Sequence, residues 1–155
     1  MRKPMKSWLA MLSLCAVAVG AAEIPGFLRL RGADLSARFE AMPLGQENFA
    51  VSLAGDFGSD LVVLVRRMGA GEAEWHEKHA DVFFVRQGKG TLVIGGTLVD
   101  ARETGPGERR ADGIAGGERV PLEEGDFVRI PAGISHQVIP AEGPFDYVVL
   151  KIVVE

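Results

Sequence analysis

The sequence predicts an all-β protein that folds as an antiparallel sandwich or barrel. The chain has 155 residues, so a single domain is expected. Most of its length consists of short runs rich in β-branched and aromatic residues, and its 20 glycines and 8 prolines largely punctuate these runs. Hydrophobic residues make up 47% of the chain and charged residues 25%, which is typical of a folded globular protein rather than a disordered one.

Residues 1–22 have the order of a secretory signal peptide. Arg2, Lys3 and Lys6 form a basic head, residues 8–19 are an uncharged apolar run, and small residues follow at 20–22. The apolar run is shorter than the roughly 20 residues that a membrane-spanning helix needs. We therefore expect a periplasmic or secreted protein that has no membrane contact after the signal is cleaved.

The only cysteine, Cys15, lies in this predicted signal, so the mature chain would form no disulfide. The residues that end at Cys15 have a faint similarity to a bacterial lipoprotein signal. Leu14, however, is bulky where such a signal has a small residue. A lipid anchor is therefore the less favoured interpretation.

Residues 23–59 are expected to form an N-terminal segment with a short helix at 33–42 and the first strand at 49–53. Pro43 and Gly45 end the helix. The barrel itself is expected over residues 60–155. Its predicted strands are the β-branched and aromatic runs 61–68, 82–86, 91–94, 127–130, 137–139 and 145–154.

Residues 100–119 break this pattern, because they have no apolar periodicity and contain five glycines. A loop of this length in a small domain is usually functional or mobile. It carries a charged cluster of Glu108, Arg109 and Arg110. The cluster is either a solvated loop tip or a flap that closes on an anionic or polar ligand, with Arg109 or Arg110 as the clamp.

The three histidines lie in two segments that each adjoin a strand. In an extended chain, residues two apart share a face, so Glu74 and His76 should point the same way. Asp81 begins the next strand and could face them across a short turn, while His136 starts a later strand. Nitrogen and oxygen ligands that converge from adjacent strands suit a divalent transition metal. His79 is out of phase, so it is either a solvated residue or, if the turn redirects it, a ligand of metal or substrate.

These segments resemble the two motifs of a small single-domain cupin. Gly125, Pro131, Gly133 and His136 match the second cupin motif, G-x5-P-x-G-x2-H-x3-N, at every spacing, although Pro140 replaces the final Asn. The first motif, G-x5-H-x-H-x3,4-E-x6-G, matches more loosely. His76, Asp81 and Gly88 keep its later spacings with Asp in place of Glu, Glu74 stands where the first His would be, and the initial Gly is missing. The resemblance covers residues 60–154. The 95–119 segment also resembles a group of exported bacterial cupins.

The resemblance implies a conical β-barrel, a jelly roll or double-stranded β-helix, with a metal between the two motifs and an open mouth for a ligand. By position, His76, Asp81 and His136 would be ligands and Glu74 a candidate fourth. The carboxylates favour Fe, Mn or Zn over softer metals. Asp is shorter than Glu by one carbon–carbon bond, so Asp81 could fail to reach the metal and instead form a hydrogen bond to one of the residues that bind it.

Two classes of function fit these features. One is a metal-dependent enzyme acting on a small molecule, with oxygenase, isomerase or lyase chemistry left open. The other is a non-catalytic exported module that binds a sugar-like or other small ligand. The net charge of −4, without a basic block after the first residues, argues against nucleic acid as a partner. A homodimer is expected, because the run 145–154 is apolar on both alternating faces and one barrel buries only one of them.

Overall fold

A computed structural model describes residues 24–45 and 48–155, so the predicted signal peptide lies outside the described residues. Over these ranges the chain forms one helix, α1 (Gly32–Ala41), and thirteen strands. The prediction of an all-β fold with a short N-terminal helix is confirmed. The strands are β1 (Phe49–Asp56), β2 (Asp60–Arg67), β3 (Ala73–His76), β4 (His79–Gln87), β5 (Lys89–Ile94), β6 (Thr97–Val99), β7 (Arg102–Gly105), β8 (Glu108–Ala111), β9 (Gly113–Ala115), β10 (Glu118–Glu123), β11 (Phe127–Ile130), β12 (His136–Pro140) and β13 (Phe145–Val153).

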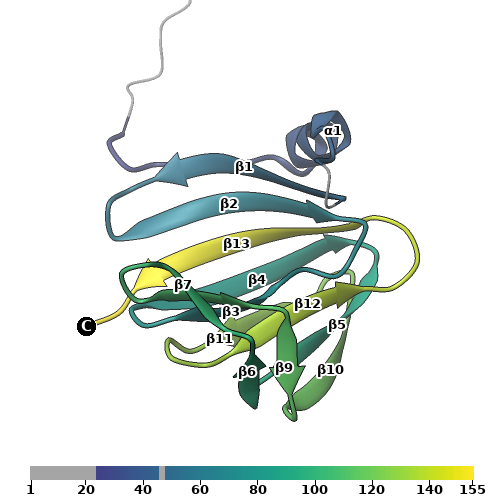
Figure 1. Ribbon diagram of the computed structural model, residues 1–155. Coiled ribbons are helices and arrows are strands. Elements are labelled where there is room, and N and C mark those ends of the chain that lie inside the picture. The colour runs from purple at the N-terminus through teal and green to yellow at the C-terminus, as the bar shows by residue number, and fades with distance from the viewer. Residues whose placement is uncertain (1–23, 46–47) are drawn as a thin grey trace, which may run out of the picture.

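Two antiparallel sheets form the body of the molecule (Figure 1). One has five strands in the order β1-β2-β13-β4-β11, and the other has six in the order β10-β5-β12-β3-β8-β7. Alternate residues point between the sheets and form the core, among them Phe83, Val85, Leu92, Ile130 and Tyr147. The strand β1 pairs with β2 along its whole length, so the sheet begins at residue 49.

The helix α1 packs on the outer face of the five-stranded sheet. Leu35 and Phe39 are four residues apart and therefore share a helix face, which is buried against Leu64 of β2. Val148 of β13 packs against the same cluster. The helix thus covers part of the second apolar face of β13. At ten residues it is far too short to cross a membrane, and no described helix could do so.

The expected long loop at 100–119 is wrong, because this segment forms β7, β8 and β9 and the start of β10. Strand β8 pairs with β3 on one side and with β7 on the other, and β7 is the edge of the six-stranded sheet. Short edge strands with charged side chains need no apolar alternation, and the charges discourage pairing with other chains. Glu108, Arg109 and Arg110 therefore belong to a sheet and not to a loop tip.

Two glycines hold the motif segments in place. Gly88 has φ +86°, and a Cβ atom there would lie 2.2 Å from the Pro144 carbonyl oxygen. Gly133 has φ +76°, and its N–H donates to the carbonyl of His76 at 2.7 Å. The turn before His136 is thereby tied to the strand that carries Glu74 and His76.

Candidate metal centre

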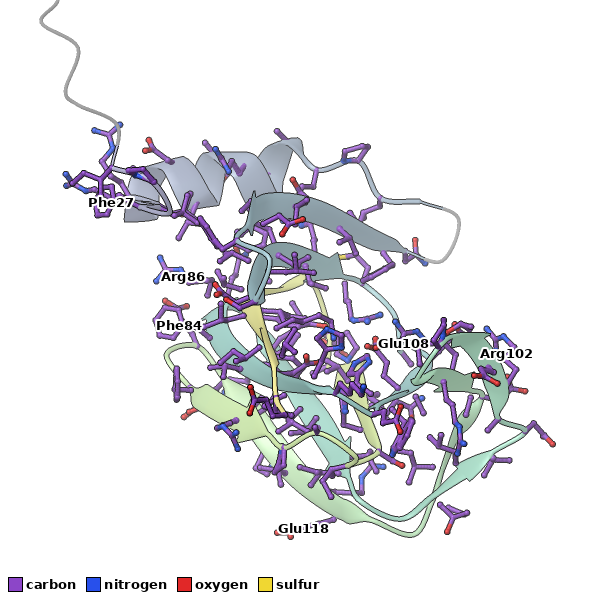
Figure 2. The ribbon with its side chains drawn as sticks, turned by 90° about the vertical axis from the view of Figure 1, so that its left-hand side faces the viewer. Phe27, Phe84, Arg86, Arg102, Glu108 and Glu118 are labelled. Carbon is purple, nitrogen blue, oxygen red and sulfur yellow. The ribbon has the colours of Figure 1, made fainter. Side chains whose placement is uncertain are left out.

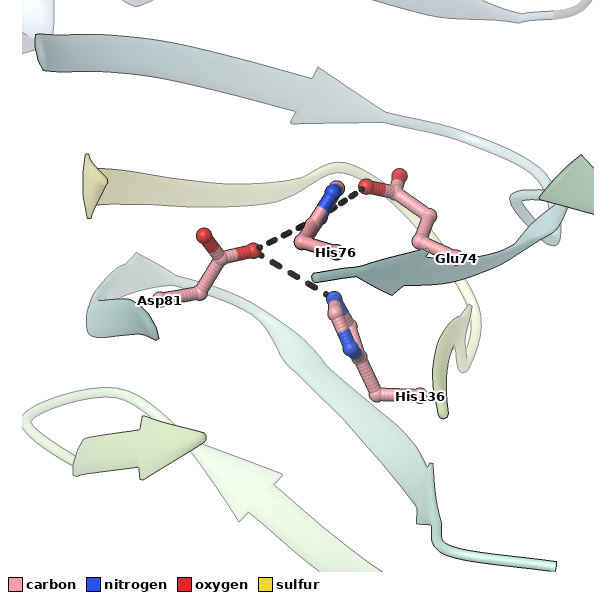
Figure 3. Close-up of side chains that lie close together, drawn as sticks. All are labelled: Glu74, His76, Asp81 and His136. Atoms are coloured by element: carbon pink, nitrogen blue, oxygen red, sulfur yellow. Dashed lines mark ion pairs between the residues drawn. The ribbon is translucent and has the colours of Figure 1, made fainter. Parts of the chain in front are cut away.

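Four side chains converge between the sheets: Glu74, His76, Asp81 and His136 (Figure 3). One nitrogen or oxygen atom from each lies within 4.8 Å of the corresponding atom of every other. His76 and Asp81 are each 2% exposed and His136 is 3% exposed, so three of the four are buried. The structure therefore brings together the residues that the sequence predicts as a metal site.

The strand pairing explains this convergence. Glu74 and His76 occupy alternate positions of β3 and share its inner face, and His136 of β12 is the direct cross-strand partner of Glu74. Asp81 reaches the cluster from β4 in the facing sheet. Its Oδ2 lies 3.4 Å from His76 Nε2 and 3.3 Å from His136 Nε2, so its short side chain is long enough to join the group.

Lys151 also enters the cluster, and the sequence analysis missed it. Its Nζ lies 2.8 Å from His76 Nε2 and donates to the two Asp81 oxygens at 2.8 and 3.1 Å. Lys151 stands directly opposite Asp81 in the pairing of β13 with β4. A signal was present, because Lys151 has the same strand phase as the inward residues Tyr147 and Val149 and is the one charged residue at that phase of β13.

Glu108 contacts two histidines, His76 of the cluster and His79 outside it. Its carboxylate lies 2.5 Å from His76 Nδ1 and 3.2 Å from His79 Nδ1. His76 and Glu108 are cross-strand partners on β3 and β8, which accounts for the contact. His79 is outside the group of four and a third of its side chain is exposed, but Glu108 links it to the cluster.

The two arginines of the predicted clamp have different places. Arg110 lies opposite Glu74 on β8, with Nη1 3.1 Å from Glu74 Oε2. Arg109 points to the other face of the strand and stacks on Trp75, 4.7 Å from the ring centre. Arg67, which the sequence did not single out, approaches Glu74 at 3.5 Å and donates to the Tyr147 hydroxyl at 2.9 Å. Only Arg110 of the predicted pair faces the site.

Charge pairing shifts the ionisation of these groups strongly. Burial alone would raise the pKa of Glu74, but its contact with His76 and the charge of Arg110 outweigh burial and lower the pKa to about 2. Burial likewise opposes the ionisation of Asp81, yet His136, His76 and Lys151 hold its pKa well below the usual range. Burial alone would lower the pKa of His76, whereas Asp81 and Glu74 raise it to about 9. The carboxylates therefore attract positive charge to this point.

The donor set fits a divalent metal ion. Two imidazoles and two carboxylates are hard-to-intermediate ligands of the kind that hold Fe, Mn or Zn. The Lys151 ammonium already marks the position of a cation between His76 and Asp81. Glu108 holds His76 through Nδ1, which leaves Nε2 to face the centre, as metal-ligating histidines commonly do.

A cavity of about 280 Å³ adjoins the cluster. Its walls are mostly apolar, with Leu61, Val63, Phe83 and Val149 among them, while Glu74, Asp81, Arg110, His136, Gln137 and Lys151 supply polar groups. The volume lies just below the roughly 300–1,000 Å³ of pockets that take drug-sized ligands. The cavity therefore suits a small ligand with an apolar part and a polar group that faces the cluster.

Comparison with known proteins finds similarity in structure alone. The sequence matches no family profile and resembles no curated protein significantly. A double-stranded β-helix protein from Klebsiella pneumoniae matches with a TM-score of 0.56 and 16% identity, covering 74% of this chain and 80% of that one. The cupin domain of Schizosaccharomyces pombe Cnp3 matches with 0.53 and 10%, covering 75% and 67%. Streptomyces PAC13 with uridine matches with 0.52 and 13%, covering 74% and 80%.

Proposed function

We propose that this chain, which has the cupin fold, binds a divalent transition metal and acts on a small molecule held beside it. The metal ligands would be His76, His136, Asp81 and Glu74, and the metal would be Fe, Mn or Zn. The observation that carries this proposal is the convergence of these four side chains next to the cavity. Buried carboxylates need a partner cation, and two imidazoles that face the same point as the carboxylates add the nitrogen ligands by which a transition metal would fill that role.

A metal held here would supply a Lewis acid or, as iron, a centre for oxygen activation. The protein's own residues define the rest of the chemistry. Glu108 fixes the orientation of His76, and Arg110 and Arg67 hold Glu74. The apolar walls exclude water and fix the body of the ligand, which strengthens polar contacts at its reactive end. Oxygenase chemistry and isomerase or lyase chemistry are both compatible with this arrangement.

Metal analysis of the purified chain tests the proposal. The parent should contain near-stoichiometric Fe, Mn or Zn, and His76→Ala and His136→Ala should each lose the metal while keeping the β-sheet circular dichroism of the parent. His79→Ala is the matched control and should keep the metal, because His79 lies outside the group of four. Metal content that is unchanged in His136→Ala would contradict the proposal.

A non-catalytic binding module is the second candidate. It is favoured by Lys151, whose ammonium already neutralises Asp81 without a metal. A fold neighbour with bound uridine shows that this architecture accommodates a small ligand. A chain that still binds a small ligand after complete chelation of metals, in a thermal-shift screen, would favour this candidate over the enzyme.

Export is part of the proposal. It rests on the basic head, apolar run and small residues at 1–22. Mass spectrometry of the protein from the periplasm or medium of a bacterial host should show a chain that starts near residue 23. An intact Met1 in exported material would contradict cleavage.

A further inference from the structure

We infer that the Lys151 ammonium and a metal ion are alternative occupants of one cation position, so that Lys151 sets how tightly this chain holds metal. The inference rests on the proposed metal site and goes beyond it, because it assigns a role to a residue outside the ligand set. It follows from which atoms Lys151 contacts, from the charge it balances and from where it can move.

Lys151 uses the atoms that a metal would use. Its Nζ lies 2.8 Å from His76 Nε2 and within 3.1 Å of both oxygens of Asp81. A metal bound to Nε2 and to an Asp81 oxygen at about 2.0–2.2 Å would lie against an ammonium that contacts the same three atoms, and the two cations would repel each other. The ammonium and a metal ligated by His76 and Asp81 therefore exclude each other.

The charge of Lys151 is needed when no metal is bound. Asp81 is 2% exposed, and a buried carboxylate without a partner is strongly destabilising. Arg67 and Arg110 are nearby, but their described ion pairs are with Glu74. Asp81 has three described ion-pair partners. Lys151, its cross-strand partner, supplies an ammonium group, and the other two, His76 and His136, supply imidazole rings.

The Lys151 side chain has room to move out of the cluster. Its side chain is 22% exposed and lines the cavity, whereas the ligands His76 and Asp81 are almost completely buried. A lysine side chain rotates about four bonds, so the ammonium can leave the cluster while the strand stays in place. Metal binding must then displace a favourable contact, which weakens the apparent metal affinity of the parent chain.

Lys151→Met tests the inference, because methionine keeps an unbranched apolar chain and removes the charge. Calorimetric titration with Zn²⁺ or Mn²⁺ should show tighter binding than in the parent, by at least about tenfold, the scale on which residues next to metal ligands change affinity. Lys89→Met is the matched control. Its side chain is 75% exposed and distant from the site, so its metal affinity should equal that of the parent.

Thermal unfolding gives a second measurement that does not depend on activity. With a chelator present, Lys151→Met should unfold at a lower temperature than the parent, and saturating metal should close or reverse that gap. If the variant does not fold without metal, Lys151→Gln keeps a polar group there and should show the same order of affinities. Recovery of β-sheet circular dichroism on adding metal to Lys151→Met would likewise support the inference.

Two negative results are distinguishable. Equal or weaker metal binding by both Lys151 variants than by the parent overturns the inference and leaves the metal site in place. No metal binding by the parent or by either folded variant overturns the metal site itself, and the inference with it.

Discussion

His76 is held from both sides of its ring, by Glu108 at Nδ1 and by Lys151 and carboxylates at Nε2. A carboxylate accepts from an N–H group, so the contact with Glu108 keeps a proton on Nδ1 and makes Nε2 the nitrogen that would bind a metal once its own proton leaves. A carboxylate behind a metal-binding histidine also makes the ring a stronger ligand. In the proposed metal site Glu108 would be a positioning residue, whereas the sequence left it either on a solvated loop tip or in a flap that closes on a ligand.

Glu108→Gln should weaken metal binding by about 10–100-fold, because an amide neither carries charge nor selects the same proton position on His76. Titration with Mn²⁺ or Zn²⁺ measures the change. Glu103→Gln, at an exposed position of the neighbouring strand β7, should bind metal like the parent. Equal affinity in Glu108→Gln and Glu103→Gln would show that the contact with His76 is without consequence.

Metal binding should strengthen as the pH rises towards 9. Asp81 and Glu74 raise the pKa of His76 to about 9 against the effect of burial, so below that pH a proton competes for Nε2. Titrations with Mn²⁺ between pH 6 and 9 should show a steady gain in affinity with pH. Glu74→Gln removes one of the two carboxylates and should shift this gain to lower pH. Affinity that is constant from pH 7 to 9 would contradict the assignment.

The residues of the site were predictable where they depend on local order or match the two cupin motifs, as Asp81 and His136 do, and not where they depend on the pairing of other strands. Glu74 and His76 share a face because they are two residues apart on one strand, and this holds in any extended chain. Lys151 meets Asp81 through pairing of strands 70 residues apart, and Glu108 meets His76 across 32 residues. Such register is set by the packing of the whole barrel, so spacing in the sequence carries no information about it.

At the scale of elements, apolar strands were recognisable and polar ones were not. The runs that became β2, β4 and β13 are buried on their inner faces and read as β-branched or aromatic segments. Strands β7 and β8 at the edge consist largely of charged residues and glycine, and their stability comes from pairing with β3 and with each other. Residues 100–119 were expected to form a loop because their strands lack the apolar alternation by which a strand is recognised in a sequence.

The helix α1 was predicted correctly, and its docking should be a large share of its stability. Phe39 is 3% exposed and packs with Leu35 on Leu64. Phe39→Ala should lower the free energy of unfolding by about 3–5 kcal/mol, the usual cost of removing a buried phenyl ring. Urea denaturation measures this cost.

Glu40→Ala is the control for that experiment, since Glu40 is exposed on the same helix and should change stability by less than about 0.5 kcal/mol. The folded Phe39→Ala protein should still bind metal at the parent stoichiometry, because α1 lies on the outer face of the sheet. A cost below about 1 kcal/mol would show that the helix is only loosely attached.

At the scale of the whole molecule, the outer face of the five-stranded sheet is only partly covered. The helix buries Leu64 and packs against Val148, but Phe84 of β4 and Phe127 of β11 stay 38% and 70% exposed as cross-strand partners. Figure 2 shows Phe27 and Phe84 on the same side of the molecule, with Arg86 beside them. Phe27 is itself 67% exposed. Exposed aromatic residues gathered on one face are typical of a surface that binds another protein.

We propose that this face pairs two copies of the chain, as the apolar pattern of residues 145–154 predicts. Two copies related by a twofold axis would bury Phe127 and Phe84 against each other and remove both from water. Light scattering at micromolar concentration should give twice the mass of the mature chain, and Phe127→Asp should shift it to the monomer by placing charges in the interface. Val99→Asp, which alters an exposed apolar residue of β6 outside the five-stranded sheet, should remain dimeric. A monomeric parent would contradict the dimer, whereas a dimer that survives Phe127→Asp would place the interface on another face.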